Sequence, residues 1–279
     1  MDQKNTDIRD KEKESTHSGA ELIMPYGGEA SKGEQVEEMF DSIAPAYDFM
    51  NTAMTLGLHR WWRHRTLAAA GRRLAGNLSK SAKTGTHSEG KGLRILDVAT
   101  GTGDVAFELH KIYPEADIVG LDLSRGMLAV AEKKLKAAGE SARKHIAFRQ
   151  GDSLALEDAD NSYDLITVAY GVRNFEQLAK GLVEMGRVLK PGGVLCIIEL
   201  AEPTGVLTRP LYRFYSRQLI PRVGKLVSGD SRAYTYLPES ISAAPQRERL
   251  ANMLADAGLH DCTWHEMTFG AVCYYLGSK

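Results

Sequence analysis

One stretch, residues 93–104 (LRILDVATGTGD), constrains the fold of this 279-residue chain more than any other. A nearly continuous apolar run leads into Gly101, Thr102 and Gly103, and a helix-like segment follows. Such a run is typical of a buried parallel strand. Glycine permits backbone angles closed to other residues and lets the main chain approach a ligand. The stretch therefore predicts a strand that ends in a cofactor-binding loop.

Two classes of cofactor fit this loop. Residues 101–106 match the loose dinucleotide fingerprint GxGxxG/A, which alone is a weak signal. Asp97 and Asp104 flank the loop, and at about 5 Å with an effective dielectric near 20 each carboxylate would oppose a phosphate by roughly 3 kcal/mol. The same acids attract a cation that lacks phosphate. The pattern therefore favours S-adenosylmethionine, with its sulfonium and ammonium groups, as the cofactor.

Composition limits the class of protein. The 35 basic and 36 acidic residues give a net charge of −1, so bulk charge does not favour nucleic acid as a partner. The chain has no apolar run near the ~18 residues of a membrane span. We therefore expect a soluble, cytoplasmic protein. Because Cys196, Cys262 and Cys273 form no CxxC motif, we expect buried reduced thiols and no metal site.

The segment ahead of residue 93 divides into three parts. Residues 1–33 are charged and polar, and are expected to form a disordered extension. Residues 34–75 predict a helical lid, because apolar residues recur at helical spacing and a mixture of aromatic and polar residues follows. Trp61 and Trp62 in that mixture also fit simple core packing. Residues 76–92, rich in Ser, Lys, Thr and Gly, predict a flexible surface insertion.

After residue 93, strands and helices alternate. The expected strands after the first are 117–123, 145–150, 163–169 and 194–200, with helices at 104–113, 124–139 and 177–189. This alternation predicts a doubly wound α/β fold with helices on both faces of a mainly parallel sheet. Residues 263–276 predict a closing antiparallel hairpin across Phe269 and Gly270. Such a hairpin is typical of the Rossmann-like class I S-adenosylmethionine-dependent methyltransferases, so we expect one methyltransferase domain over residues 34–279.

Polar residues at two strand ends are candidates for binding the cofactor. Asp122 lies 21 residues after Gly101, a spacing that suits an acid accepting hydrogen bonds from ribose hydroxyls. The alternative is a carboxylate at a strand end with no partner. Asp152 and Ser153 follow the next strand. Asp152 can accept a hydrogen bond from an adenine amino group, or it is simply a turn residue.

Several motifs occur together in a single known family. They are Met39–Ala44 (MFDSIA), Tyr47-Asp48, Gly171-Val172-Arg173-Asn174 and Tyr234–Ile241 (YTYLPESI). From about Val36 to its end, the chain resembles the C-methyltransferases of menaquinone and ubiquinone biosynthesis (the UbiE/MenG family). By this resemblance Thr102, Asp122, Asp152 and Ser153 match positions that bind S-adenosylmethionine. The stretch Glu199–Pro203 departs from the family pattern.

The resemblance implies methylation of a ring carbon of a prenylated quinol, either demethylmenaquinol or the equivalent ubiquinone precursor. The ring carbon becomes nucleophilic when the phenol ionises, which at a pKa near 10 costs roughly 4 kcal/mol at neutral pH. Arg173 and Asn174 are candidates for stabilising the phenolate. Arginine is too basic to take the proton unaided, which leaves a water, His59, or Tyr47 with Asp48. The alternatives are a loop-stiffening salt bridge for Arg173 and a structural hydrogen bond for His59.

Two other functions compete with this interpretation. A methyltransferase for another small molecule would share every cofactor residue and differ only in the substrate pocket. A non-catalytic subunit of a quinone-synthesis complex would bind cofactor without turnover. A nucleic-acid methyltransferase is disfavoured, because the chain lacks overall basicity and an NPPY-type motif.

The segment 207–241 is expected to face substrate and membrane. Arg209, Arg213 and Arg217 recur every four residues, so on a helix they would form a basic stripe beside aromatic residues. Such a surface suits the headgroups of an anionic membrane and predicts peripheral contact at the inner face of the cytoplasmic membrane. The alternatives are a partly buried helix with solvated arginines, or the subunit interface of a homodimer.

Overall fold

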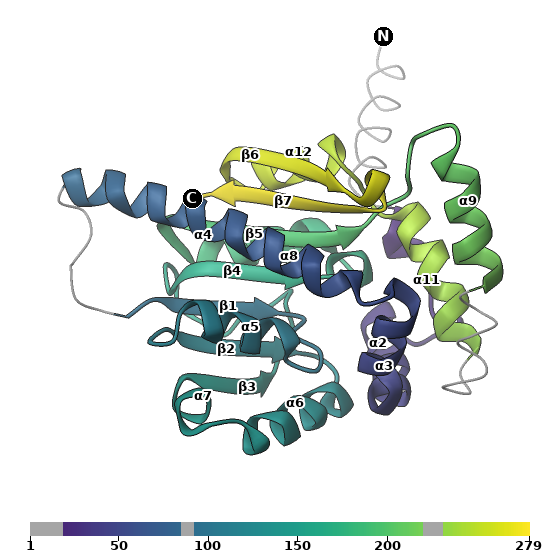
Figure 1. Cartoon of the computed structure of the whole chain (residues 1–279), viewed down its shortest axis with the longest axis horizontal. Helices are drawn as coiled ribbons and strands as arrows, with labels where there is room; N and C mark the ends of the chain where they lie inside the picture. Colours follow the sequence, from purple (N-terminus) through teal and green to yellow (C-terminus); the bar gives the residue numbers. More distant parts are fainter. Residues whose placement is uncertain (1–18, 85–91, 220–230) are drawn as a thin grey trace, which may run out of the picture.

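A seven-stranded sheet lies at the centre of the protein (Figure 1). The structure, a computed structural model, describes residues 19–84, 92–219 and 231–279. The strands are β1 (Arg94–Val98), β2 (Asp117–Asp122), β3 (Ile146–Gln150), β4 (Tyr163–Ala169), β5 (Leu189–Leu200), β6 (His260–Met267) and β7 (Val272–Ser278). They lie in the order β3-β2-β1-β4-β5-β7-β6. Strands β1 to β5 are parallel, and β7 runs antiparallel to both β5 and β6, so the predicted fold class and closing hairpin are confirmed.

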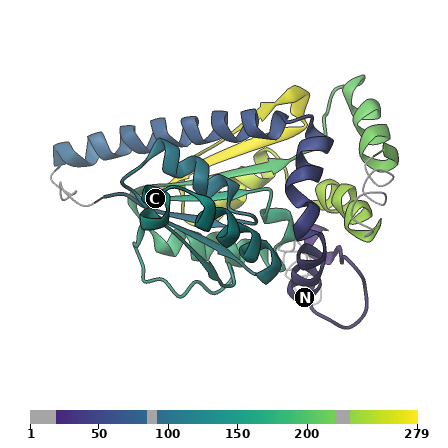
Figure 2. The same ribbon diagram turned by 60° about the horizontal axis from the view of Figure 1, so that its bottom comes forward.

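Helices cover both faces of the sheet (Figure 2). One face carries α4 (Leu58–Thr84), α5 (Asp104–Ile112) and α7 (Glu140–His145), with α6 (Arg125–Ala137) at the β3 edge; the other carries α8 (Leu178–Val188) and α12 (Glu248–Asp256). Alternate strand residues enter the two cores, because successive side chains of a strand point to opposite faces. Ile95 packs in the α4 and α5 core, whereas Leu96 packs in the α8 and α12 core.

A separate helical cap lies at the carboxyl ends of the parallel strands (Figures 1 and 2). It consists of α2 (Lys32–Ile43), α3 (Tyr47–Thr55), α9 (Thr208–Phe214) and α11 (Ser231–Ala243). Its own apolar cluster joins Met39 of α2, Met50 of α3 and Tyr236 of α11 to Met127 of α6. The cap therefore closes over the edge of the sheet at which ligands bind in this fold class.

Residues 19–33 differ from the expected disordered extension. Gly19–Leu22 forms a 3-10 helix, and Lys32 begins α2 with its side chain buried. The Lys32 ammonium donates hydrogen bonds to the carbonyl oxygens of Ala20 (2.6 Å) and Arg173 (3.1 Å). These bonds satisfy a buried polar group that the sequence pattern suggested would be solvated. Residues 1–18 of that prediction lie outside the described residues.

The expected flexible insertion at 76–92 also needs correction. Helix α4 continues through Gly76 to Thr84, although Gly and Thr are weak helix formers. A tertiary contact supports this extension, because the Asn77 side-chain amide donates to the carbonyl oxygen of Gly192 and to Ser278 Oγ. Residues 85–91 of the predicted insertion lie outside the described residues.

Smaller features of the fold also bear on the predictions. The expected helix 124–139 is present as α6, and Ser124 caps it by accepting a hydrogen bond from the Met127 N–H, whereas α7 was not predicted. The three cysteines are free, but Cys262 is only half-buried. Within the described ranges, helices long and apolar enough to cross a membrane are absent, as are groups of three or more potential metal ligands.

Candidate active site

Two adjoining cavities lie where the helical cap meets the strand ends. The larger has a volume of about 570 Å³ and the smaller about 270 Å³. They share a wall of six residues: Phe40, Tyr47, Ala99, Gly101, Ala169 and Tyr170. Because Ala99 and Gly101 belong to the loop after β1, the predicted cofactor loop borders both cavities. A ligand in one cavity would therefore lie next to a ligand in the other.

The smaller cavity has polar residues at the ends of β2 and β3 in its lining, and one of them is Asp122. One carboxylate oxygen of Asp122 accepts the Gly101 N–H (2.8 Å), and the other accepts the Ser124 N–H (2.9 Å). Burial raises the pKa of Asp122 to about 6, against the effect of the hydrogen bonds from these two backbone groups. Asp122 thus joins the loop after β1 to the end of β2 and still faces the cavity.

Asp152 and Ser153 line the same cavity, as expected. Asp152 Oδ1 accepts the N–H of Leu154 (2.8 Å), which gives the residue the turn geometry considered as its alternative role. Since both residues also face the cavity, the turn and a ligand contact are compatible. The arrangement leaves Asp152 Oδ2 without a hydrogen-bond donor among the described residues.

The three residues of the glycine loop have different surroundings. Gly101 has φ +57°, and a Cβ there would meet only open space. Gly103 has φ +81° and lines neither cavity; a Cβ there would lie 2.7 Å from a ring carbon of Phe148. Thr102 faces the larger cavity, and its hydroxyl donates to Asp48 Oδ1 (2.6 Å). Of these three loop residues, Gly101 is therefore the one that borders the smaller cavity. The lack of a side chain at Gly103 permits close packing at the start of α5.

The two acids that flank the loop do not present free charge to a cofactor, which corrects the electrostatic argument from the sequence. Asp97 lies beneath the loop, lines neither cavity, and accepts hydrogen bonds from the hydroxyls of Thr100 and Thr167. Burial raises its pKa to about 7. Asp104 forms ion pairs with Arg63 (2.9 Å) and Lys134 (2.8 Å). Burial thus weakens the charge of Asp97, and two cations compensate that of Asp104. Neither effect could be inferred from the positions of these acids in the sequence.

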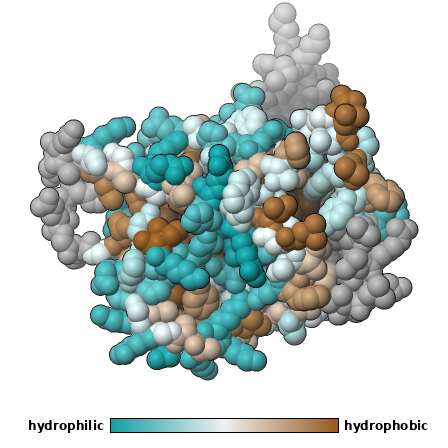
Figure 3. All heavy atoms as spheres, in the orientation of Figure 1, coloured by the Kyte–Doolittle hydropathy of each residue, from teal (hydrophilic) through white to brown (hydrophobic). Residues whose placement is uncertain are grey.

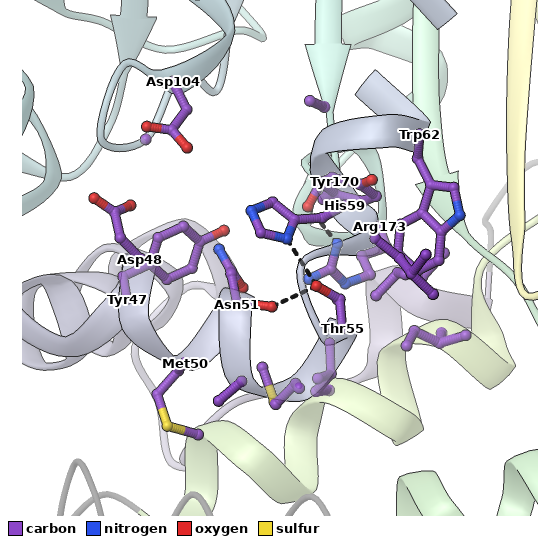
Figure 4. A pocket seen from close by; sticks show the side chains of 18 of the residues that line it. Tyr47, Asp48, Met50, Asn51, Thr55, His59, Trp62, Asp104, Tyr170 and Arg173 are labelled. Atoms are coloured by element: carbon purple, nitrogen blue, oxygen red, sulfur yellow. Dashed lines mark hydrogen bonds between the residues drawn. The ribbon is translucent and has the colours of Figure 1, made fainter. Parts of the chain in front are cut away.

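The larger cavity is lined mainly by apolar side chains, several of them methionines. Polar groups project from one side, where Figure 4 shows Tyr47, Asn51, Thr55, His59 and Arg173 around the same space. The apolar part is formed by Met39, Phe40, Ile43, Met50, Met54, Leu56, Leu58, Leu200, Leu237 and Ile241. Such a space fits a mainly apolar ligand whose polar groups face the polar side chains.

Arg173 lines the larger cavity, but it also forms the salt bridge considered as its alternative role. Its guanidinium donates to Glu199 Oε1 (2.8 Å) and to the carbonyl oxygen of Tyr170, and both charged side chains are buried. Burial lowers the pKa of Arg173, but Glu199, Tyr47 and Tyr236 together more than offset that effect, so the pKa lies above its ordinary value. Arg173 is therefore a permanent cation that cannot accept a proton.

Asn174 is separated from Arg173 by the wall between the cavities. It lines the smaller cavity, and its Oδ1 accepts a hydrogen bond from the Tyr236 hydroxyl (3.1 Å). We expected Arg173 and Asn174 to meet the same ligand group. The short 3-10 turn Val172–Asn174 instead directs consecutive side chains to different cavities.

Two residues of the site were missed in the sequence. Tyr170 lies between the cavities with φ +58°, an unusual backbone conformation for an aromatic residue, and its buried hydroxyl has no partner among the described residues. Glu199 is the buried partner of Arg173. A signal for Glu199 was present, because a single acid inside the apolar run 194–200 is rarely buried without a partner.

Comparison with known proteins decides which family this architecture represents. A profile of the ubiE/COQ5 methyltransferase family matches residues 29–279. The chain belongs to the ubiE/COQ5 methyltransferase family. It is 42% identical over 260 residues to a demethylmenaquinone methyltransferase of Bacteroides fragilis, covering 93% of this chain and 98% of that protein. It is 38% identical over 266 residues to the ubiquinone/menaquinone biosynthesis C-methyltransferase UbiE of Pseudomonas fluorescens, covering 95% of each.

Solved structures show the same fold at low sequence identity. Phosphoethanolamine N-methyltransferase 2 of Haemonchus contortus aligns with a TM-score of 0.51 at 17% identity, over 74% of this chain and 52% of that one. The methyltransferase bound to the activator Trm112 in Haloferax volcanii aligns with a TM-score of 0.52 at 17% identity, over 86% and 96%. At this identity the likeness concerns the fold, and membership of the ubiE/COQ5 family confirms the predicted enzyme class.

Proposed function

We propose that this chain transfers the methyl group of S-adenosylmethionine to a ring carbon of demethylmenaquinol. The observation that carries the proposal is the pair of adjoining cavities with Gly101 in their common wall: the smaller has acidic and amide side chains in its lining, and the larger is mainly apolar. Relatives named demethylmenaquinone methyltransferase match almost the whole chain, which supports the same substrate class. The methyl donor would occupy the smaller cavity, and the prenylated ring would occupy the larger, mainly apolar cavity.

The residues of the smaller cavity fit S-adenosylmethionine. The cofactor supplies an electrophilic methyl group on a sulfonium when it is bound. Asp122 would hold the ribose hydroxyls and Asp152 the adenine amino group, because each carboxylate keeps acceptor capacity beyond its backbone hydrogen bonds. Gly101 would let the main chain approach the cofactor, since a Cβ there would project into open space. Ser153 and Asn174 complete the polar lining.

The residues of the larger cavity would orient the quinol ring and stabilise its phenolate. Arg173 contributes a permanent positive charge in a buried setting, where charge acts more strongly than in water. Burial raises the pKa of Tyr47, so its hydroxyl stays protonated and can donate a hydrogen bond. Tyr47 borders both cavities, which places it beside the position of the reacting atoms.

The test is a methyl-transfer assay with the purified full chain. We expect demethylmenaquinol and deuterium-labelled S-adenosylmethionine to yield menaquinol that carries the labelled methyl on its ring carbon, detected by mass spectrometry. The ubiquinone precursor is the second candidate, because relatives such as that of Pseudomonas fluorescens are named for both pathways. Cofactor binding by calorimetry without turnover on either quinol would contradict the proposal and favour a non-catalytic subunit.

A prenylated substrate also raises the question of membrane contact. Apolar side chains are exposed at three places near the larger cavity: the junction of α3 and α4 (Leu56, Trp61), α9 with the two residues before it (Val206, Leu207, Leu211, Phe214), and the turn between β6 and β7 (Phe269). Figure 3 shows apolar side chains at the surface where α9 lies. The elements are joined, because the Tyr215 hydroxyl donates to the carbonyl oxygen of Met54 and the Trp62 ring N–H donates to Thr268 Oγ1 (2.8 Å).

We propose that this apolar rim touches the lipid surface and admits the prenylated quinol to the larger cavity. The predicted basic stripe contributes less than expected, because Arg209 and Arg213 both pair with Glu202. The side chain of Arg217, the third residue of the predicted stripe, lies outside the described residues. The homodimer interpretation of this segment stays a prediction, which sedimentation velocity of the purified chain would test.

A further inference from the structure

His59 has an unusual position in the larger cavity. It is the second residue of α4, its side chain is only 5% exposed, and it lines the cavity wall. Figure 4 shows one ring nitrogen directed at Thr55 and the other directed toward the space bordered by Tyr47, Asp48 and Asp104. A buried histidine with one nitrogen held and the other facing a cavity has the arrangement of an oriented base.

The hydrogen bonds of Thr55 determine which ring nitrogen of His59 carries the proton. Thr55 Oγ1 lies 2.6 Å from the carbonyl oxygen of Asn51 and 2.7 Å from His59 Nδ1. A carbonyl oxygen only accepts, so the single hydroxyl proton of Thr55 is donated to Asn51. The hydrogen bond to the ring must then run from Nδ1–H to Thr55 Oγ1. Neutral His59 is therefore protonated on Nδ1, and the lone pair of Nε2 faces the cavity.

The surroundings of His59 keep the ring neutral. Burial lowers its pKa below the ordinary 6.5, and the nearby cations Arg63 and Arg60 lower it further. Asp104 and Asp48 oppose this effect. Their influence is limited, because Asp104 is paired with Arg63 and Lys134, and Asp48 with Lys134. At neutral pH the imidazole can therefore accept a proton.

The other ionisable groups of the cavity are poor acceptors. Arg173 stays protonated, and the carboxylates of Asp48 and Asp104 are engaged in ion pairs. Burial raises the pKa values of the tyrosines in the wall, so they remain neutral donors. Among the described residues that line this cavity, His59 alone combines a neutral basic atom with a fixed orientation toward the ligand space.

Resting on the proposed function, the geometry points to His59 as the residue that accepts the hydroxyl proton of the quinol, with Thr55 as its positioning residue. The O–H bond breaks as the proton moves to Nε2, and the electron pair of the phenolate shifts to the adjacent ring carbon. That carbon forms a bond to the methyl group as the methyl–sulfur bond breaks and leaves its electron pair on sulfur. The carbon then loses its hydrogen as a proton, which restores the aromatic ring. The oxygen regains a proton from the imidazolium, and one proton is released to solvent overall.

The test compares variants at His59 and Thr55 with a control on the same helix. We expect H59Q and H59A to lower kcat by 10²- to 10⁴-fold, the usual contribution of general base catalysis, with unchanged affinity for S-adenosylmethionine by calorimetry. Added imidazole should partly restore H59A. T55V should lower kcat and T55S should retain it, since only the hydroxyl orients the ring. H64Q should behave like the wild type, because His64 is largely exposed on the outer face of α4.

Two further readouts separate a base from a structural residue. The kcat of the wild type should fall as the pH drops through the lowered pKa of His59, and this limb should vanish in H59Q. Nitrogen-15 NMR of the labelled wild-type chain should show the Nδ1–H form of one histidine, a signal that T55V loses. This measurement does not depend on the folding of any His59 variant.

Each outcome has a distinct meaning. A wild-type chain that methylates no quinol refutes the proposed function and the role of His59 with it. An active wild type whose H59Q variant keeps its kcat and acid limb refutes His59 alone. An Nε2–H form of His59 itself also refutes the proposal, because that nitrogen would then have no lone pair for the substrate.

Discussion

Asp122 is the residue at which the loop after β1, the end of β2 and the smaller cavity meet. We expect Asp122→Ala to weaken S-adenosylmethionine binding by about 1.5 to 3 kcal/mol, the scale of a hydrogen bond to a charged group. Calorimetry measures the affinity, and circular dichroism checks the fold. Asp117→Ala is a matched control, because this acid begins the same strand and is mostly exposed. Unchanged affinity in a folded Asp122 variant would disprove the assignment.

Glu199 holds the charge of Arg173 in the interior, so its removal should affect stability. Glu199→Gln leaves the buried guanidinium without its counter-charge, and breaking such a pair typically costs about 3 to 5 kcal/mol. Urea denaturation measures the free energy of unfolding. Asp160→Asn removes a largely exposed partner of Arg187 and should cost at most about 1 kcal/mol. Equal losses of unfolding free energy in the two variants would contradict the expectation that breaking a buried ion pair costs more than breaking an exposed one.

Asp97 makes stability depend on pH in a direction that can be derived. Its pKa is raised from 3.8 to about 7 in the folded chain, so the folded state binds the proton more tightly than the unfolded state. The contribution to stability is complete below about pH 4 and is lost as the pH rises through 7. Asp97→Asn cannot titrate, so the loss of unfolding free energy between pH 5 and 8 should be smaller than in the wild type. The same pH dependence in both proteins would contradict this role.

At the scale of single elements, side chains of α4 hold the hairpin of β6 and β7 by several hydrogen bonds, two of them from Arg73 to β6 and one from Asn77 to β7. A further bond from α4 reaches the tip of the hairpin. The Trp62 ring N–H donates to Thr268 Oγ1 at the tip of the hairpin. Thr268→Val leaves this donor unsatisfied and should lower the free energy of unfolding by about 1 to 3 kcal/mol. Thr268→Ser keeps the hydroxyl and should cost less. Thermal denaturation compares the two, and indistinguishable melting temperatures would argue against the contact.

The strands and the helices of the α/β core could be predicted because their signals are local. Apolar runs, glycine turns and the Ser124 cap each lie within a few residues of the element that they define. The helical continuation at 76–84 and the order at 19–33 could not be predicted, because they depend on partners far along the chain. Asn77 contacts Gly192 and Ser278, and Lys32 contacts Arg173.

At the scale of the whole molecule, the sequence predicted which residues lie near the cavities better than it predicted which cavity each residue lines. Of the residues expected to contact the cofactor, Gly101, Asp122, Asp152 and Ser153 line the smaller cavity, whereas Thr102 lines the larger and Gly103 lines neither. The sequence could not show that Arg173 and Asn174 point into different cavities, because adjacent residues in a turn diverge according to backbone geometry. Nor could it show that Asp104 is neutralised by Arg63 and Lys134.

The distribution of apolar side chains over the molecule leads to the last prediction. Leu211 and Phe214 on α9 are 70% and 65% exposed, and fully burying such a side chain contributes about 1.5 to 3 kcal/mol. The wild type should therefore sediment with anionic phospholipid vesicles at low salt, and the double variant L211S/F214S should bind at least tenfold more weakly, a change of about 1.4 kcal/mol.

Two comparisons complete the vesicle experiment. Val183 on α8 is 51% exposed but lies outside the wall of the larger cavity, so V183S should bind vesicles like the wild type. R213E/R217E should weaken binding through repulsion from anionic lipid, and added salt should diminish that difference because surface charges are screened. Arg213 is already paired with Glu202, so this effect should be smaller than that of L211S/F214S. A wild type that stays in the supernatant at low salt, or a V183S defect as large as that of L211S/F214S, would refute membrane contact through the apolar rim.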